Sequence, residues 1–200
     1  MQRCEESVCS DTRSRILQAA QEMFIDEGYR ASVDGIATRA GVAKQTLYNH
    51  FPSKEVLFIE VIKQGSAQVL FSLDEADGGL RLVLLQFAYT FRQRVLEKGS
   101  LAIMRILTAE INRLPELTQE FFAKGPGQTL ARLAELFSVA MDKGEMRRDD
   151  PHFAAEMLMG MLLNLDFIRH QCAVPMPEGD EGGRCERIVD YFLRAFAPQV

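Results

Sequence analysis

The segment from Ser32 to Lys54, SVDGIATRAGVAKQTLYNHFPSK, predicts two short helices joined by a glycine turn. Ser32 is placed to cap the first helix, and Asp34 falls in its first turn, where the helix dipole favours an acid. Gly41 can adopt the positive φ that ends a helix sharply. The apolar residues of this first helix recur at helical spacing and form one face: Val33, Ile36, Ala37 and Ala40.

The second predicted helix, residues 43–50, is short and mostly polar. Leu47 and Phe51 are spaced four apart, so both turn inward together. The remaining side chains are left largely outside: Lys44, Gln45, Thr46, Tyr48, Asn49 and His50. Two short helices with this turn and a polar outer face favour a helix-turn-helix, in which the second helix enters the DNA major groove. An ordinary helical hairpin with a solvated polar face is the alternative.

The run GIATRAGVAKQTLYNHFPSKEVLF closely resembles the DNA-binding signature of TetR-type bacterial transcriptional regulators, IAxxAGVxxxTLYxHFxxKExL. The resemblance covers roughly residues 12–62. Further along, residues 114–160 resemble the regulatory domain of the AefR-like branch of the same family. The resemblance implies a DNA-binding head, a helical body and no enzymatic activity.

The resemblance also assigns roles to residues of the head. Phosphate contacts are implied for Tyr48, His50 and Lys54, and for Ser32 from the preceding helix. Base-facing positions are implied for Lys44, Gln45, Thr46 and Asn49. Gln45 and Asn49 lie four apart, and each offers a donor and an acceptor that suit adenine. Three alternatives stay open: His50 as a helix-terminal histidine, Tyr48 as a core residue, and Lys54 as a solvated charge.

The formal net charge of the 200-residue chain is −5, which at first sight disfavours a nucleic-acid partner. Residues 34–54, however, hold three basic residues against one acidic residue. Affinity for DNA depends on the charges that reach phosphates, so the acidic total does not exclude it.

The rest of the chain also predicts helices, and the expected fold class is all-α. A helix is expected at 12–27, ended by Gly28, and another from Lys54 to about 73 with Ser53 as its cap. Further helices are expected at 79–97, 100–112, 115–142 with an interruption near 125–127, 151–171 and 184–196. The predicted domains are a three-helix DNA-binding domain at 1–54, with an ordered core at about 12–52, and a regulatory and dimerisation domain at 55–200.

Family resemblance implies that the body forms a homodimer and holds a small-molecule effector. The pairing helices would be 151–171 and 184–196, although a monomer could bury the same apolar residues. A small apolar or aromatic ligand is expected, because Met and aromatic side chains form adaptable apolar pockets. The candidate lining residues, any of which could instead be plain core, are Phe87, Phe91, Met104, Arg105, Leu107, Phe121, Phe122, Met161 and Asn164.

Other classes of function find little support in the sequence. Cys4, Cys9, Cys172 and Cys185 show no CxxC spacing, so neither a metal site nor a cofactor is expected. No glycine-rich phosphate loop, His–carboxylate cluster or GxSxG motif indicates an enzyme. No signal sequence or membrane span is expected, and the predicted location is cytoplasmic. A protein-interaction module and a cysteine-based redox regulator remain the alternatives.

Overall fold

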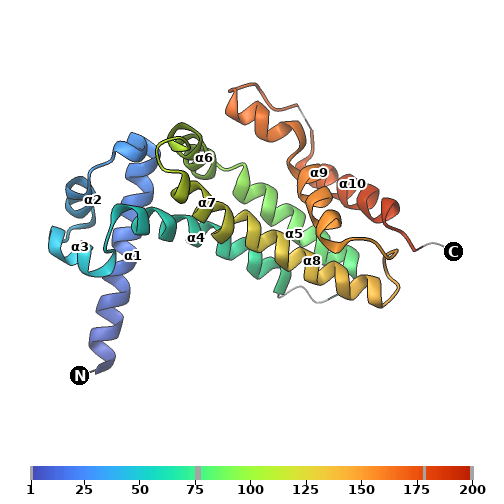
Figure 1. The fold of residues 1–200 in the computed structure, drawn as a ribbon, viewed down its shortest axis with the longest axis horizontal. Helices are drawn as coiled ribbons and strands as arrows, with labels where there is room; N and C mark the ends of the chain where they lie inside the picture. Colours follow the sequence, from blue (N-terminus) through green and yellow to red (C-terminus); the bar gives the residue numbers. More distant parts are fainter. Residues whose placement is uncertain (1, 75–77, 178, 199–200) are drawn as a thin grey trace. The chain divides into compact units, whose positions relative to one another are not determined.

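The computed structural model describes residues 2–74, 78–177 and 179–198, and all regular secondary structure in these ranges is helical (Figure 1). The prediction of an all-α fold is therefore confirmed. The chain divides into two compact units. The first comprises Met1–Gln64 and Lys98–Lys124, and the second comprises Gly65–Glu97 and Gly125–Val200.

The first unit begins with α1 (Gln2–Glu27), a short 3-10 turn η1 (Gly28–Arg30), α2 (Val33–Ala40) and α3 (Lys44–His50). The first part of α4 (Lys54–Asp74) follows, and α6 (Lys98–Glu110) and α7 (Pro115–Lys124) complete the unit. Helix α1 starts ten residues before the predicted Thr12, because residues 2–11 contain neither glycine nor proline to interrupt it.

A single apolar core holds this unit together. Phe24 of α1 packs edge-on against Phe58 of α4, with ring centroids 5.0 Å apart. Ile103 and Ile106 of α6 are buried in the same cluster. The head, α1 to α3 with the start of α4, and helix α7 provide the other members, among them Ile16, Ala20, Ile36, Ala37, Leu47, Phe51 and Leu117. Packing across this core therefore groups α6 and α7 with the head.

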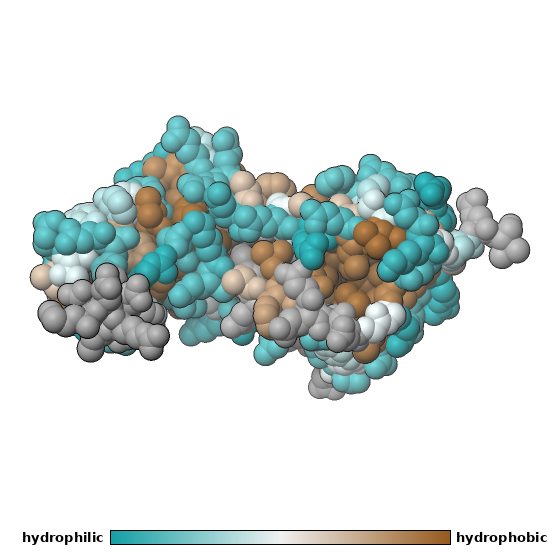
Figure 2. Space-filling view, turned by 90° about the horizontal axis from the view of Figure 1, so that it is seen from below, coloured by the Kyte–Doolittle hydropathy of each residue, from teal (hydrophilic) through white to brown (hydrophobic). Residues whose placement is uncertain are grey.

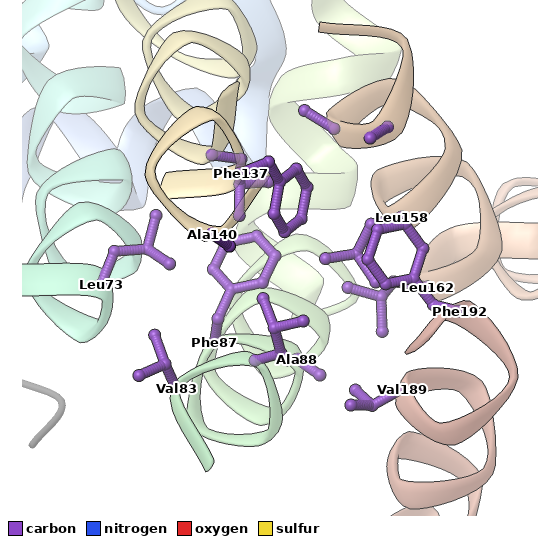
Figure 3. Close-up of a cluster of buried hydrophobic side chains, with 14 of the residues drawn as sticks. Leu73, Val83, Phe87, Ala88, Phe137, Ala140, Leu158, Leu162, Val189 and Phe192 are labelled. Carbon is purple, nitrogen blue, oxygen red and sulfur yellow. The ribbon is translucent and has the colours of Figure 1, made fainter. Parts of the chain in front are cut away.

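The second unit contains the end of α4, then α5 (Leu80–Val95), α8 (Pro126–Asp142), α9 (Pro151–Gln171) and α10 (Glu181–Ala195). Side chains from all of these helices meet in one apolar core (Figure 3). Phe87 of α5, Phe137 of α8 and Phe192 of α10 are fully buried there, and the rings of Phe137 and Phe192 lie 5.2 Å apart.

Helix ends follow local sequence signals. Ser53 accepts a hydrogen bond from the Val56 amide at 3.2 Å, which confirms it as the cap of α4. The predicted helix at 115–142 is two helices, because the helical conformation is interrupted at Gly125 and α8 begins at Pro126. Helix α10 begins at Glu181 rather than at 184. Asp180 accepts hydrogen bonds from the amides of Gly182 and Gly183 and so caps the helix earlier.

The predicted boundary between domains at residues 54 and 55 assigns functions to two continuous stretches of chain. The compact units are instead discontinuous in sequence, because α6 and α7 pack on the head. The functional division into 1–54 and 55–200 stays a prediction.

Most of the surface seen in Figure 2 is hydrophilic, with separate hydrophobic areas. By length and composition, Lys54–Leu73 of α4 is apolar enough to cross a membrane. The same stretch buries Leu57, Phe58 and Ile59 in the core of the first unit, as a core helix does. That no membrane is involved stays a prediction.

Candidate nucleic-acid interface

The turn between α2 and α3 fixes where the short helix α3 begins. Gly41 has φ 66° and ψ 39°, the left-handed conformation that glycine adopts most readily, as predicted. Its amide donates to the carbonyls of Ala37 and Thr38, and the amide of Val42 donates to Ala37 at 3.0 Å. These bonds satisfy the last carbonyls of α2 and turn the chain into α3.

Arg15 of α1 supports the same turn from outside. Its Nη2 donates to the carbonyl of Ala40 and, at 3.0 Å, to the carbonyl of Gly41. A helix end leaves its last carbonyls without partners inside the helix, and Arg15 satisfies two carbonyls at this turn. Nothing in the local sequence distinguishes Arg15 from other exposed arginines, so sequence reasoning missed it.

Helix α3 presents two contrasting faces. Leu47 and the following Phe51 are buried, with exposures of 0% and 1%. The opposite face carries Gln45 and Asn49, and the Gln45 Nε2 donates to the Asn49 Oδ1 at 3.1 Å. The other predicted DNA contacts on α3 are exposed at Lys44 and Tyr48 and half-buried at Thr46 and His50. Most of the predicted α3 positions therefore share one outward polar surface.

Two of the predicted DNA contacts are also engaged within the head. Ser32 Oγ accepts a hydrogen bond from the Gly35 amide at 3.0 Å, which confirms the predicted cap of α2. Lys44 at the start of α3 forms an ion pair with Asp34 of α2 at 2.9 Å. This hydrogen-bonded pair raises the pKa of Lys44.

Lys54 is not a merely solvated charge. Its Nζ lies 4.5 Å from the centre of the Tyr29 ring and donates to the Tyr29 carbonyl. The Tyr29 hydroxyl in turn donates to Glu55 at 3.0 Å. Burial lowers the pKa of Lys54 despite the nearby Glu55. Lys54 therefore ties η1 to the start of α4 in addition to any contact with DNA.

The nine candidate ligand residues of the body do not form one group. Phe87 and Phe91 lie in the core of the second unit with Met161 packed against it, whereas Leu107 lies in the core of the first. Met104 and Phe121 pack against that first core, and Arg105 and Phe122 are exposed. The side chain of Asn164 lies outside the described residues. The expected ligand residues are divided between two cores because α6 and α7 pack on the head. Their role as ligand contacts stays a prediction.

A buried cluster of charges lies in the second unit. Asp166 of α9 is 0% exposed, and Arg92 of α5 is 1% exposed. Arg92 donates to Asp166 at 2.9 Å. Burial alone would raise the pKa of Asp166, but the hydrogen bond from Arg92 and the charge of Arg184 lower it. Sequence reasoning missed Arg92, whose only signal is its place on the apolar face of α5, four residues after Ala88.

The cysteines that are described differ in environment. Cys172 is exposed, whereas Cys185 is buried, and burial raises the pKa of its thiol to about 11. A thiol with so high a pKa is a poor nucleophile at neutral pH. The side chains of Cys4 and Cys9 lie outside the described residues, and a redox role stays a prediction. Among the described side chains, no group of three or more His, Cys, Asp or Glu is arranged to hold a metal ion.

Two family models match the chain. The model of "Bacterial regulatory proteins, tetR family" matches residues 16–61, which contain α2 and α3. The model of "AefR-like transcriptional repressor, C-terminal domain" matches residues 82–198, more than half of the chain.

Several known transcriptional regulators are similar to this chain over most of the length of both proteins. The transcriptional regulator UidR of Escherichia coli K12 is 29% identical over 160 residues, which is 78% of each chain. A solved TetR-family regulator from Mesorhizobium loti is 31% identical, with a TM-score of 0.76 over 94% of this chain and 96% of that one. The regulator FrrA is 28% identical, also with a TM-score of 0.76, over 94% and 98% of the two chains. With its helix-turn-helix and helical C-terminal part, the chain belongs to the TetR family of bacterial transcriptional regulators, which are DNA-binding proteins and not enzymes.

Proposed function

We propose that this protein is a homodimeric repressor that binds a palindromic operator and is released by a small apolar or aromatic ligand. The observation that carries the proposal is the outward polar face of α3, on which Gln45 and Asn49 are joined by a hydrogen bond of 3.1 Å. A helix that buries Leu47 and exposes paired amides is suited to reading base edges in the major groove. Acting on bacterial DNA would place the protein in the cytoplasm.

The proposed division of labour on DNA follows from exposure and chemistry. Gln45 and Asn49 would read bases, with Lys44 and Thr46 beside them on α3. Tyr48 and His50 would contact phosphates, together with Ser32 and Lys54 from the flanking helices. Contacts to phosphate set register and affinity, whereas contacts to base edges set sequence preference. In the free protein one hydrogen bond joins the side chains of Gln45 and Asn49. Each amide keeps further donor and acceptor capacity for a base.

The proposed dimer rests on apolar side chains that the second unit leaves exposed. On α9 they recur at helical spacing, at Phe153, Met157, Leu165 and Ile168, each at least 42% exposed. Tyr191 of α10 is 56% exposed. Large exposed apolar stripes mark interaction surfaces in soluble proteins. A two-fold dimer would cover this stripe with its own copy and present two α3 helices to the two half-sites of a palindrome.

Similar proteins support release by a ligand. FrrA is described as a flavonoid-responsive regulator, and flavonoids are aromatic molecules. The matching C-terminal family model is that of a repressor. A ligand releases DNA only if it binds the DNA-incompetent conformation more tightly, typically by about 1–3 kcal/mol of coupling. Phe87, Phe91 and Met161 of the second unit remain the proposed apolar contacts.

DNA binding is tested by selecting preferred sequences from random duplexes with the purified protein. A two-fold symmetric site is expected. Gln45→Ala should lose discrimination at one base pair per half-site, by about 1–3 kcal/mol. Gln18→Ala is the matched control, because Gln18 is an exposed glutamine on α1 that pairs only with Glu22 in this structure. Unchanged sequence preference in Gln45→Ala would remove the assignment of Gln45 as a base reader.

The dimer is tested by light scattering coupled to size exclusion. Leu165→Asp places a charge in the exposed stripe of α9 and should shift the protein toward monomer. Leu82→Asp, at a residue of α5 that is 55% exposed, introduces the same charge elsewhere and should leave the mass unchanged. A wild-type protein that elutes as a monomer at micromolar concentration contradicts the proposed dimer.

A further inference from the structure

The second unit contains a hollow of about 530 Å³ near the connection between α9 and α10. Ligand sites for small molecules commonly measure about 300–1,000 Å³, so the hollow is large enough for one. Its apolar wall consists of Tyr89, Leu96, Met176 and Pro177. None of the nine ligand residues expected from sequence lines it.

Beneath the hollow lies the buried charge cluster. Asp166 accepts three arginine hydrogen bonds or ion pairs: from Arg92 at 2.9 Å, from Arg169 at 2.8 Å and from Arg184 at 2.9 Å. Arg92 also reaches the carbonyl of Leu162 and both carboxylate oxygens of Glu181, the first residue of α10. Arg92, Arg184 and Glu181 all line the hollow.

The cluster carries an excess of positive charge. Three guanidinium groups face two carboxylates, which leaves one positive charge without a carboxylate inside the cluster. Arg187 on the rim adds another cation, and its only bond to described residues is a long one of 3.4 Å to the Gly183 carbonyl. Of the other described acids of the rim, Glu97 pairs with Arg94, whereas Asp180 caps α10 and keeps a negative charge that offsets the charge of Arg187.

Arg184 provides donors on the side of the hollow. Its Nη1 is paired with Asp166, and its side chain is 27% exposed. A guanidinium has five N–H donors in a planar fork, and one engaged nitrogen leaves the others for an incoming acceptor. Carboxylates fit such a fork with two parallel hydrogen bonds. A partly buried position strengthens that attraction relative to the open surface.

We propose that this hollow binds a small organic carboxylate whose body is apolar or aromatic. The carboxylate would lie against Arg184 and Arg187 and neutralise the excess charge, and the body would lie against Tyr89, Met176 and Pro177. The proposal rests on the proposed function for its regulatory meaning. It names a chemical class for the effector and places the effector in this hollow instead of against Phe87, Phe91 and Met161, which do not line it. Because His170 of α9 and Glu181 of α10 both line the hollow, a ligand here would contact both helices of the proposed dimer surface.

The test uses the full-length protein and isothermal titration with 1-naphthoate, and with 1-naphthamide as an uncharged probe of nearly the same shape. Naphthoate is expected to bind and naphthamide to bind more weakly. Arg187→Gln should weaken naphthoate binding by about two- to fivefold, the range of a solvent-accessible ion pair. Glu181→Gln keeps the shape and an acceptor for Arg92 but removes a negative charge, so it should strengthen binding by a similar factor.

Arg194→Gln is the matched control. Arg194 is also an exposed arginine of α10, and it lies outside the hollow, over the ring of Tyr191. Naphthoate affinity should therefore be unchanged in this variant. Circular dichroism checks that all three variants are folded.

Any of three results would overturn the proposal. Naphthoate does not bind up to its solubility limit, naphthamide binds with the same affinity as naphthoate, or the naphthoate affinity is unchanged in Arg187→Gln and Glu181→Gln. The proposal is also overturned if Arg194→Gln weakens naphthoate binding as much as Arg187→Gln does. Binding is measured without DNA, so a failure here leaves operator binding intact and is distinguishable from a failure of the proposed regulator.

Discussion

Replacing Gly41 by alanine tests whether the turn before α3 controls DNA binding. A residue with a side chain costs roughly 1–2 kcal/mol in the left-handed conformation that Gly41 adopts, with φ 66°. The new Cβ would also lie 2.8 Å from Nη2 of Arg15. Arg15 is flexible enough to move aside, but it would then lose its hydrogen bonds to Ala40 and Gly41, each worth roughly 0.5–1.5 kcal/mol. We expect a total loss of stability of about 2–5 kcal/mol.

Gly144 offers a matched control for this substitution. It has φ 74°, and a Cβ added there meets nothing within 4 Å. Gly144→Ala should therefore show only the backbone cost, about 1–2 kcal/mol, and wild-type DNA binding. Gly41→Ala should in addition lose about tenfold or more in affinity for the selected DNA site, measured by fluorescence anisotropy under conditions where both variants are folded. Wild-type DNA affinity in Gly41→Ala would refute the idea that this turn positions α3.

Three further substitutions have defined outcomes. Tyr48→Phe should lower affinity for all DNA sequences about equally, as measured by anisotropy with specific and random duplexes. Lys54→Ala should do the same, reduce the slope of log affinity against log salt by about one, and lower stability by about 1 kcal/mol through the lost Tyr29 contact. Asp166→Asn should lower stability by about 3–5 kcal/mol in urea unfolding at pH 7, because it removes the buried negative charge that Arg92, Arg169 and Arg184 share. The pKa of Asp166 is lowered in the folded state, so its stabilisation is present above the ordinary carboxyl pKa and is lost as the pH falls through the folded value. The difference between wild type and Asp166→Asn should therefore shrink below about pH 4.

The head could be predicted from sequence because its signals are local. Ser32, Gly41 and Ser53 each act on residues within four positions, and all three do what their positions predict. The inward pair Leu47 and Phe51 follows from helical spacing alone, and both are buried.

Long-range partners could not be predicted in the same way. Arg15 contacts a turn 25 residues away, and Arg92 contacts Asp166 at a separation of 74 residues. Helical periodicity indicates which face of α6 is apolar but not which core that face joins. The sequence therefore does not separate the expected ligand residues, whereas the structure divides the apolar ones that lie in or against a core between two cores.

The proposed function requires that α3 reads DNA sequence. This is measured by the affinity of wild type and Gln45→Ala for the selected site and for every single-base variant of one half-site, at fixed salt. We expect wild type to discriminate by about 1–3 kcal/mol at the base pair facing Gln45 and Gln45→Ala to lose discrimination there alone. Equal affinity of the wild-type protein for the selected site and for random duplex DNA would contradict this expectation.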